Sequence, residues 1–179
     1  MARLIGILAS ALLLAGCSAQ PQANAAATSP DTPAKASAHP TSGLAITDVT
    51  VKSGGKDHIF RTELAITPEQ QARGMMFRTE MGDNEAMLFP SELPAPRSFW
   101  MKNTPLSLDI IFIGPDGTIS NIAERTEPYS EKSNLSDGPT IAVLELRGGR
   151  SKELGIGPGD AVTWSIPDAV SDKSANLDE

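Results

Sequence analysis

The stretch SLDIIFIGPDGTISNIAER (residues 107–125) contains two predicted strands and the turn between them. Residues 107–113 and 118–125 are rich in β-branched side chains, which are typical of strands. Pro115-Asp116-Gly117 lies between them and is typical of a tight turn. This segment therefore predicts two consecutive strands, and it sets the expectation for the rest of the chain.

The same strand pattern recurs on both sides of this segment. Ala45–Lys52 and the run that contains Phe60, Thr62, Leu64 and Ile66 predict a hairpin around Ser53-Gly54-Gly55-Lys56. Further strands are predicted at 86–89, 98–101, 140–147 and 161–166. Closely spaced strands with two short helices predict a mainly β fold, a compact antiparallel β-barrel or sandwich. Closure into a barrel would also remove exposed strand edges.

Both predicted helices are short. Thr67 can cap the first one, Pro68 suits its first position and Gln70 completes a capping box. Gly74 is a plausible end for this helix. The second helix is predicted over 149–154 and ends at Gly155.

The N-terminus has the pattern of a signal peptide over residues 1–16. Arg3 precedes the apolar stretch Leu4–Leu14, which is shorter than the roughly 20 residues of a membrane-spanning helix. Leu14-Ala15-Gly16-Cys17 follows, and this run resembles the lipobox of bacterial lipoproteins, in which the cysteine thiol is acylated. The alternative is an ordinary secretory signal with a cysteine at this place by accident.

Acylation at Cys17 would anchor the protein in a membrane by hydrocarbon chains. Ser18 stands where an Asp indicates inner-membrane retention in many Gram-negative lipoproteins. We therefore expect the cell envelope as the location, with the protein on the outer membrane and facing the periplasm.

Composition divides the remaining chain into three parts. Residues 17–43 are dominated by Ala, Pro, Ser and Thr after the cysteine, so we expect an unfolded tether in which His39 has no role. Residues 44–168 are long enough to bury a core and form the predicted domain. Residues 169–179 read as a polar tail.

Charge and cysteine count exclude several classes of protein. The net charge is −7, which disfavours nucleic-acid binding and electrostatic attachment to anionic lipid. A single cysteine permits no intrachain disulfide and no cysteine-based metal cage. No familiar catalytic, phosphate-binding or dinucleotide-binding motif is present, so no cofactor is predicted.

Several motifs together resemble one known family. They are Thr67-Pro68-Glu69, the run Ala72–Arg78, Met87-Leu88-Phe89, Phe99-Trp100-Met101-Lys102-Asn103-Thr104 and Pro158-Gly159-Asp160. The chain resembles the DUF192 (UPF0127) family over roughly Ile46 to Ile166. Ala86 and Ser107 differ mildly from the family, which usually has Gly at the first position and Ile-Pro-Leu-Asp around the second. The resemblance implies a compact β-rich fold and little about chemistry.

Asp109 is the first candidate for a site residue. Both faces of its predicted strand are largely apolar, so a buried carboxylate that needs a partner is expected. Lys102, Arg73 and Arg78 are the candidate partners in a structural ion pair. The functional alternative is a small polar pocket formed by Asp109, Lys102 and Asn103 with Trp100 as a wall. Glu145, on another strand, raises the same question.

Three functional hypotheses follow. The leading one is a non-catalytic module that binds a small ligand or an envelope component through Arg73, Arg78, Trp100, Lys102, Asn103, Asp109 and Glu145. The second is an envelope hydrolase that uses Asp109 and Glu145 as a carboxylate pair. The third is copper handling by Met75, Met76, Met81, Met87 and Met101, although thioethers also fill irregular gaps in a core.

Overall fold

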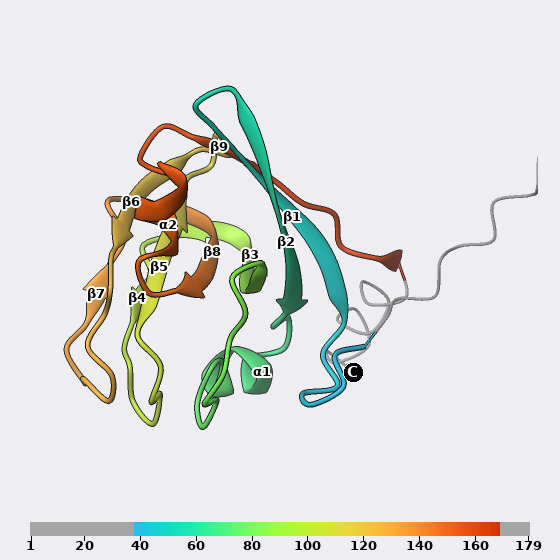
Figure 1. The fold of residues 1–179 in the computed structure, drawn as a ribbon, viewed down its shortest axis with the longest axis vertical. Helices are drawn as coiled ribbons and strands as arrows, with labels where there is room; N and C mark the ends of the chain where they lie inside the picture. The colour runs from blue at the N-terminus through green and yellow to red at the C-terminus, as the bar shows by residue number, and fades with distance from the viewer. Residues whose placement is uncertain (1–37, 169–179) are drawn as a thin grey trace, which may run out of the picture. The chain divides into compact units, whose positions relative to one another are not determined.

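The computed structural model describes residues 38–168, and Figure 1 shows its elements. The signal peptide, Cys17, most of the tether and the polar tail lie outside the described residues. No helix between residues 38 and 168 is long and apolar enough to cross a membrane. The strands are β1 (Ile46–Ser53), β2 (Lys56–Leu64), β3 (Glu85–Ala95), β4 (Ser98–Phe99), β5 (Leu108–Ile113), β6 (Ile119–Ala123), β7 (Asn134–Leu135), β8 (Thr140–Arg147) and β9 (Ala161–Thr163). The helices are α1 (Pro68–Arg73) and α2 (Arg150–Leu154).

The described chain is mainly β, as predicted. Seven strands form one sheet in the order β6-β5-β8-β3-β2-β1-β9, and β4 pairs with β7 in a small second sheet. All pairs are antiparallel except β2–β3, which is parallel. The antiparallel expectation is wrong for this pair, because parallel strands need a long crossover and residues 65–84, with α1, provide it.

The large sheet is sandwich-like and is not a closed barrel. Its edge strands are β6 and β9, and in the described part of the chain an isolated bridge between Thr118 and Ala161 joins their ends. The backbone N–H of Ile119 donates to the carbonyl of Asp160 there, at 2.9 Å. The ends therefore meet at one place without a continuous ladder, and the barrel alternative is wrong.

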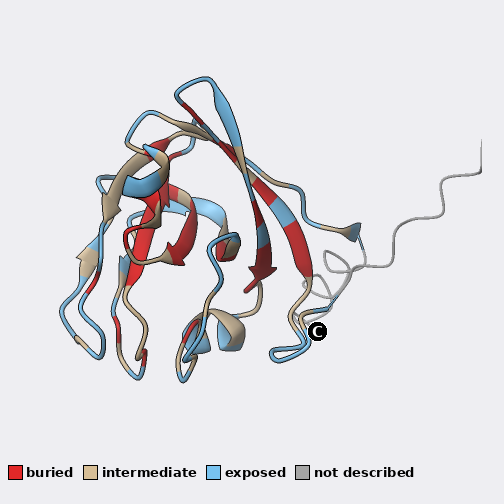
Figure 2. Cartoon of the chain, viewed as in Figure 1, coloured by how far each residue is buried: buried red, intermediate tan, exposed pale blue. Residues whose placement is uncertain are grey.

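Strands β5 and β8 lie at the centre of the core and are buried on both faces, as Figure 2 shows. Ile111 pairs with Leu144 in one apolar cluster, and Phe112 pairs with Val143 in another. Each fully buried large apolar side chain contributes about 1.5–3 kcal/mol relative to exposure. Each face of β5 packs in its own apolar cluster. The sequence of β5 therefore does not alternate between apolar and polar residues as that of a half-buried strand does.

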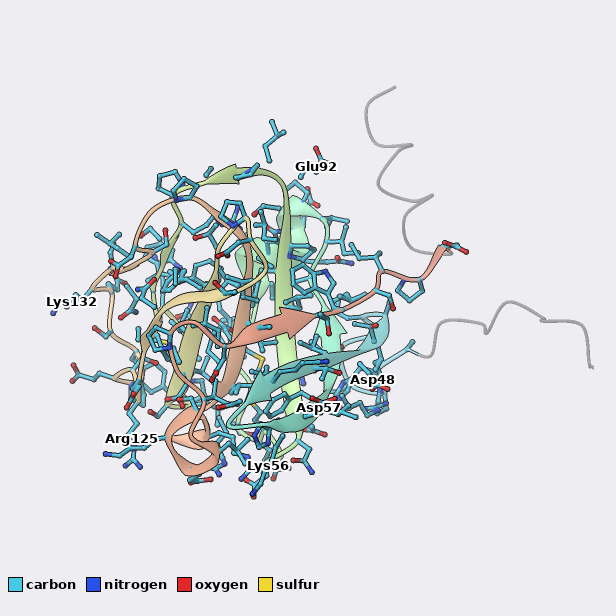
Figure 3. The ribbon with its side chains drawn as sticks, turned by 90° about the horizontal axis from the view of Figure 1, so that it is seen from above. Asp48, Lys56, Asp57, Glu92, Arg125 and Lys132 are labelled. Carbon is cyan, nitrogen blue, oxygen red and sulfur yellow. The ribbon has the colours of Figure 1, made fainter. Side chains whose placement is uncertain are left out.

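Charged side chains occupy the outside of the domain. Lys56, Asp57, Glu92 and Lys132 are exposed, and Figure 3 places them at its periphery. Ionised groups in these places keep their hydration, which burial would remove. Buried acids are therefore the exceptions that need an explanation.

Helix α1 begins at the predicted capping box. The Thr67 hydroxyl accepts a hydrogen bond from the Gln70 N–H at 3.3 Å, and the Gln70 side chain accepts one from the Thr67 N–H at 3.0 Å. These bonds satisfy backbone donors that the first turn leaves without partners. Gly74 is the C-cap with φ 46°, so the prediction of both ends is confirmed.

Residues upstream of the expected boundary at Leu44 contact the folded domain. Ala38 forms a bridge with Ala45, and the Ser42 hydroxyl donates a hydrogen bond to the Glu63 carboxylate. His39, expected to have no role, lies with Nδ1 3.7 Å from the same carboxylate. Glu63 is buried and requires hydrogen-bond donors or a cation. Its contacts with Ser42 and His39 therefore attach residues to the domain that composition alone assigns to the tether.

Candidate functional site

Glu145 lies on β8 with its side chain inside an apolar environment. Its neighbours across the sheet are Met87 on β3 and Ile110 on β5, both fully buried. Residues that face each other on antiparallel strands share one face of a sheet, so all three side chains point the same way. Glu145 itself is 4 % exposed.

The Glu145 carboxyl group has an oxygen without a partner. Oε2 is buried and forms no hydrogen bond with any residue that the structure describes. Burial raises the pKa of Glu145 to about 8, because an apolar environment disfavours the charged form. The carboxyl group is therefore largely neutral at pH 7, when it can both donate and accept a hydrogen bond.

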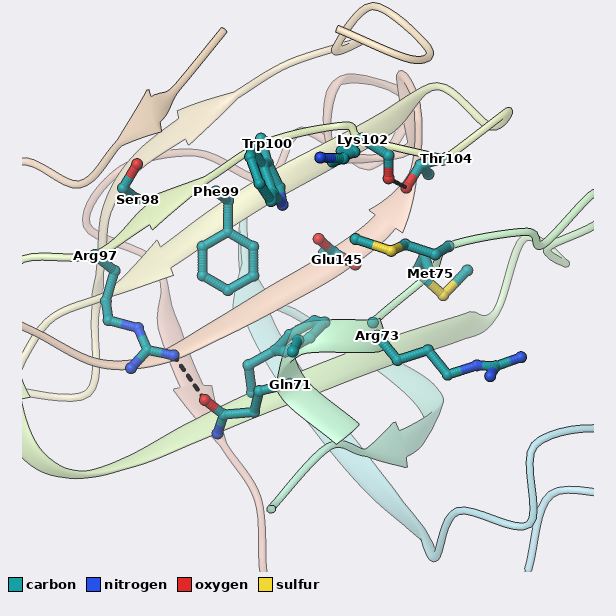
Figure 4. A pocket seen from close by; sticks show the side chains of 14 residues that line it. Gln71, Arg73, Met75, Arg97, Ser98, Phe99, Trp100, Lys102, Thr104 and Glu145 are labelled. Carbon is teal, nitrogen blue, oxygen red and sulfur yellow. Dashed lines mark hydrogen bonds between the residues drawn. The ribbon is translucent and has the colours of Figure 1, made fainter. Parts of the chain in front are cut away.

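A pocket of about 170 Å³ opens beside Glu145 (Figure 4). Since one water needs roughly 10–15 Å³ of such space, the pocket has room for about ten water-sized groups. Figure 4 shows Glu145 between Phe99 and Trp100 on one side and Met75 on the other. The lining comes from α1 and the residues after it, β3, the segment around β4, and β8: Gln71, Ala72, Arg73, Gly74, Met75, Met76, Phe89, Arg97, Ser98, Phe99, Trp100, Lys102, Thr104 and Glu145.

The aromatic walls of the pocket are held by packing. The rings of Phe89 and Phe99 meet edge to face with centroids 5.1 Å apart, and Phe99 meets Phe112 in the same way at 6.2 Å. Gly74 allows the end of α1 to lie against this wall, because a Cβ there would come within 3.3 Å of the Phe89 ring. The pocket is therefore preformed, as ligand sites commonly are.

Three cationic side chains line the pocket, and none of them forms an ion pair or hydrogen bond with Glu145 in the described part of the chain. Arg97 donates to the Gln71 side-chain oxygen at 3.0 Å, and its guanidinium lies 5.8 Å from the centre of the Phe99 ring. The Lys102 ammonium lies 5.0 Å from the centre of the Trp100 ring. Arg73 extends away from Glu145 in Figure 4. The protein therefore places positive charge around the pocket and leaves the acid unpaired.

Comparison with known proteins gives the family. The family model of DUF192, described as an uncharacterized ACR, matches residues 49–164. The chain belongs to the DUF192 family. The resemblance of its motifs to that family is thus confirmed.

Two solved structures resemble the DUF192 domain. A protein of unknown function from Novosphingobium aromaticivorans is 50 % identical with a TM-score of 0.71, covering 73 % of this chain and 94 % of its own. A Sinorhizobium meliloti protein described as a "putative transcription regulator" is 40 % identical with a TM-score of 0.66, covering 68 % of this chain and 95 % of its own. The search of curated proteins found no match.

Asp109 of the DUF192 domain is buried but lies outside the pocket. Its Oδ1 accepts hydrogen bonds from the N–H groups of Arg125 and Gly149, both at 2.8 Å. Its Oδ2 accepts from the Ser151 N–H at 2.9 Å and from the Ser151 hydroxyl. The expected ion pair with Lys102, Arg73 or Arg78 is wrong, because backbone donors at the start of α2 satisfy the carboxylate.

The two strand acids do not form a catalytic pair. Glu145 pairs with Ile110, whereas Asp109 pairs with Leu146, so the two carboxylates project from opposite faces of the sheet. A glycosidase needs both carboxyl groups beside one substrate bond. The hydrolase alternative based on Asp109 and Glu145 is therefore wrong.

The pocket of the DUF192 domain contains Arg73, Trp100, Lys102 and Glu145 from the expected site. Arg78 instead donates to the Glu63 carboxylate at 2.7 Å. The Asn103 amide is 3.9 Å from the Met76 sulfur.

Most of the methionines belong to the core. Met75, Met87 and Met101 are buried in one apolar cluster, and Met81 packs against it. The Met101 sulfur also accepts a hydrogen bond from the Thr126 hydroxyl at 3.1 Å. Packing against apolar neighbours explains their number, as is common for flexible thioether side chains.

Proposed function

We propose that this DUF192 protein is an envelope lipoprotein whose folded domain binds a small molecule in the Glu145 pocket. The observation that carries the proposal is the unpartnered Glu145 oxygen at a preformed, aromatic-walled pocket. A buried polar group without a partner costs roughly 1–3 kcal/mol. A ligand that supplies the missing hydrogen bond would recover part of that free energy.

Binding is favoured over catalysis by the chemistry of the pocket wall. Among the described residues that line the pocket, Glu145 is the single acid and there is no histidine or cysteine. Acid–base catalysis and nucleophilic catalysis commonly use such groups in pairs. Aromatic walls combined with polar and charged side chains that can orient a small molecule are instead typical of a site that recognises a ligand.

The membrane part of the proposal depends on Cys17, which lies outside the described residues. Acylation is supported by the apolar stretch, by the lipobox-like Leu14-Ala15-Gly16-Cys17 and by the tether-like composition after it. Ser18, which stands where an Asp would indicate inner-membrane retention, supports an outer-membrane location facing the periplasm. Labelling cells with a fatty-acid analogue tests this directly. The wild type should be labelled and Cys17→Ala should not, and equal labelling of both would end the lipoprotein proposal.

Thermal unfolding with a panel of amines, amino acids, sugars and short carboxylic acids tests the binding site. A ligand at 100 times its Kd stabilises the folded state by about 2.7 kcal/mol. We expect at least one compound class to stabilise the wild type and the Glu92→Gln control, with a much smaller effect on Glu145→Gln. Glu92 is exposed and does not line the pocket. Stabilisation that is equal in all three proteins would place the site elsewhere, and no stabilisation would contradict the proposal.

A further inference from the structure

The geometry points to a specific ligand class: we propose that Glu145 accepts the ammonium group of a small zwitterion, whose anionic group lies toward Lys102 and Arg73. This inference rests on the proposed binding function and adds the chemistry of the ligand. A compound of the amino-acid class has the required pair of charges.

Glu145 needs hydrogen-bond donors that its surroundings do not supply. A carboxylate has about four acceptor positions, and the Oε2 of Glu145 uses none with described residues. Its cross-strand neighbours Met87 and Ile110 have no N–H or O–H in their side chains. An ammonium group brings three donors on one atom, more than a ligand hydroxyl or amide nitrogen can offer.

The charge of an ionised Glu145 also favours a cationic ligand group. An ionised carboxylate is stable in an apolar environment when a cation pairs with it. The pocket's own cations do not fill this role: Arg97 is bound to Gln71, and the Lys102 ammonium lies over the Trp100 ring and 3.9 Å from Glu131. If Glu145 ionises on binding, its counter-charge therefore comes from the ligand.

The aromatic wall of the pocket also favours a cation. Phe89, Phe99 and Trp100 all line the pocket, and aromatic faces attract cations, most strongly where water is excluded. Arg97 and Lys102 already lie over the rings of Phe99 and Trp100, which shows that this wall accommodates positive charge. A volume of about 170 Å³ limits the ligand to a small molecule.

Two cationic side chains can bind the anionic group of the proposed ligand. Arg73 lines the pocket and is exposed, and its guanidinium has no hydrogen bond or ion pair with any residue in the described part of the chain. Lys102 is half-buried on the same lining. The Arg73 guanidinium can receive a carboxylate from the outer end of a ligand whose ammonium group has entered the pocket. Lys102 can do the same by exchanging its exposed ion pair with Glu131, which is 3.9 Å long.

Calorimetric titration of the full chain with three probes of equal carbon number tests the inference: butylammonium, 4-aminobutanoate and butanoate. We expect butylammonium to bind at least tenfold more tightly than butanoate, and 4-aminobutanoate more tightly than either. Glu145→Gln should remove the preference for ammonium, whereas Glu92→Gln should keep it. Melting curves establish that both variants are folded.

Proton release gives a second readout. Because the pKa of Glu145 is about 8, ammonium binding near pH 6.5 should release close to one proton, seen as different heats in buffers of different ionisation enthalpy. Butanoate binding as tight as that of butylammonium, or ammonium binding without proton release, would overturn the inference. If butanoate binds and Glu145→Gln abolishes this, the pocket is a ligand site and only the ligand class is wrong. If no probe binds and the broader panel also fails, the proposed function fails with it.

Discussion

Asp109 and Glu145 lie on adjacent strands and project from opposite faces of the same sheet. Asp109 accepts three hydrogen bonds from Gly149 and Ser151 at the start of α2 and a fourth from the Arg125 N–H. Glu145 instead has a buried oxygen that accepts none from described residues. The first carboxylate thus stabilises the fold. The second is the group that we propose a ligand contacts.

Replacing Asp109 by Asn should destabilise the domain by about 3 kcal/mol, because an amide NH₂ would face N–H and O–H donors that now bind a carboxylate. Urea denaturation measures this loss. Asp48→Asn is the matched control, since Asp48 is exposed on β1, and it should change the free energy of unfolding by less than about 0.5 kcal/mol. Equal stability of the two variants would contradict the structural role of Asp109.

Glu145 should make the stability of the domain depend on pH. Its folded pKa is about 8 against an ordinary value of 4.5, so the folded state holds a proton that the unfolded state loses between these values. The stabilising contribution is complete below pH 4.5 and disappears as the pH rises through about 8, by at most about 1.4 kcal/mol per unit.

Glu145→Gln removes this titration. The variant should therefore gain stability relative to the wild type as the pH rises from 5 to 8, and the difference should level off above pH 8. Other groups titrate alike in both proteins, so urea denaturation at several pH values isolates the contribution of Glu145. A difference that stays constant over this range would show that the carboxyl group is ionised throughout.

The capping box at α1 should contribute measurably to stability. Thr67→Ala removes the acceptor of the Gln70 N–H bond and should cost about 1 kcal/mol in the free energy of unfolding. Thr79→Ala, in the exposed loop beyond the helix, serves as the control and should have little effect. Thermal denaturation of both variants tests this, and a neutral Thr67→Ala would mean that packing alone determines the start of α1.

Gly149 should tolerate no side chain. Its φ is 86°, and a Cβ would lie 2.8 Å from the guanidinium of Arg125, so Gly149→Ala should destabilise the domain by about 1–2 kcal/mol. Gly157 has no positive φ and open space around its Cβ position, so Gly157→Ala should be neutral or slightly stabilising. The two melting temperatures decide the matter, and similar values would contradict the strain at Gly149.

Local features were predictable because they depend on neighbours in the chain. Thr67, Pro68 and Gln70 specify the start of α1 within one helical turn, and Pro115-Asp116-Gly117 specifies a turn. The strand periodicity also predicted the mainly β class. Pairing was less accessible: β2 and β3 are parallel because the crossover that contains α1 returns the chain to the same end of the sheet.

The site was predictable only in part, because its residues come from segments that are far apart in the sequence. Residue types and motifs indicated Arg73, Trp100, Lys102 and Glu145. Phe89 on β3 and Arg97 join them only when the chain is folded.

By itself, the amino-acid sequence determined the family, the helix ends, the main strands and the presence of two strand acids in apolar surroundings. Tertiary structure alone decided which acid has donors and which does not. The reason is the register of β5 and β8: pairing Ile110 with Glu145 turns that acid toward the pocket, and pairing Asp109 with Leu146 turns the other toward the backbone of α2. A shift of one residue in that register would turn one strand over relative to the other and bring both acids to the same face, and no local pattern in either strand specifies the register.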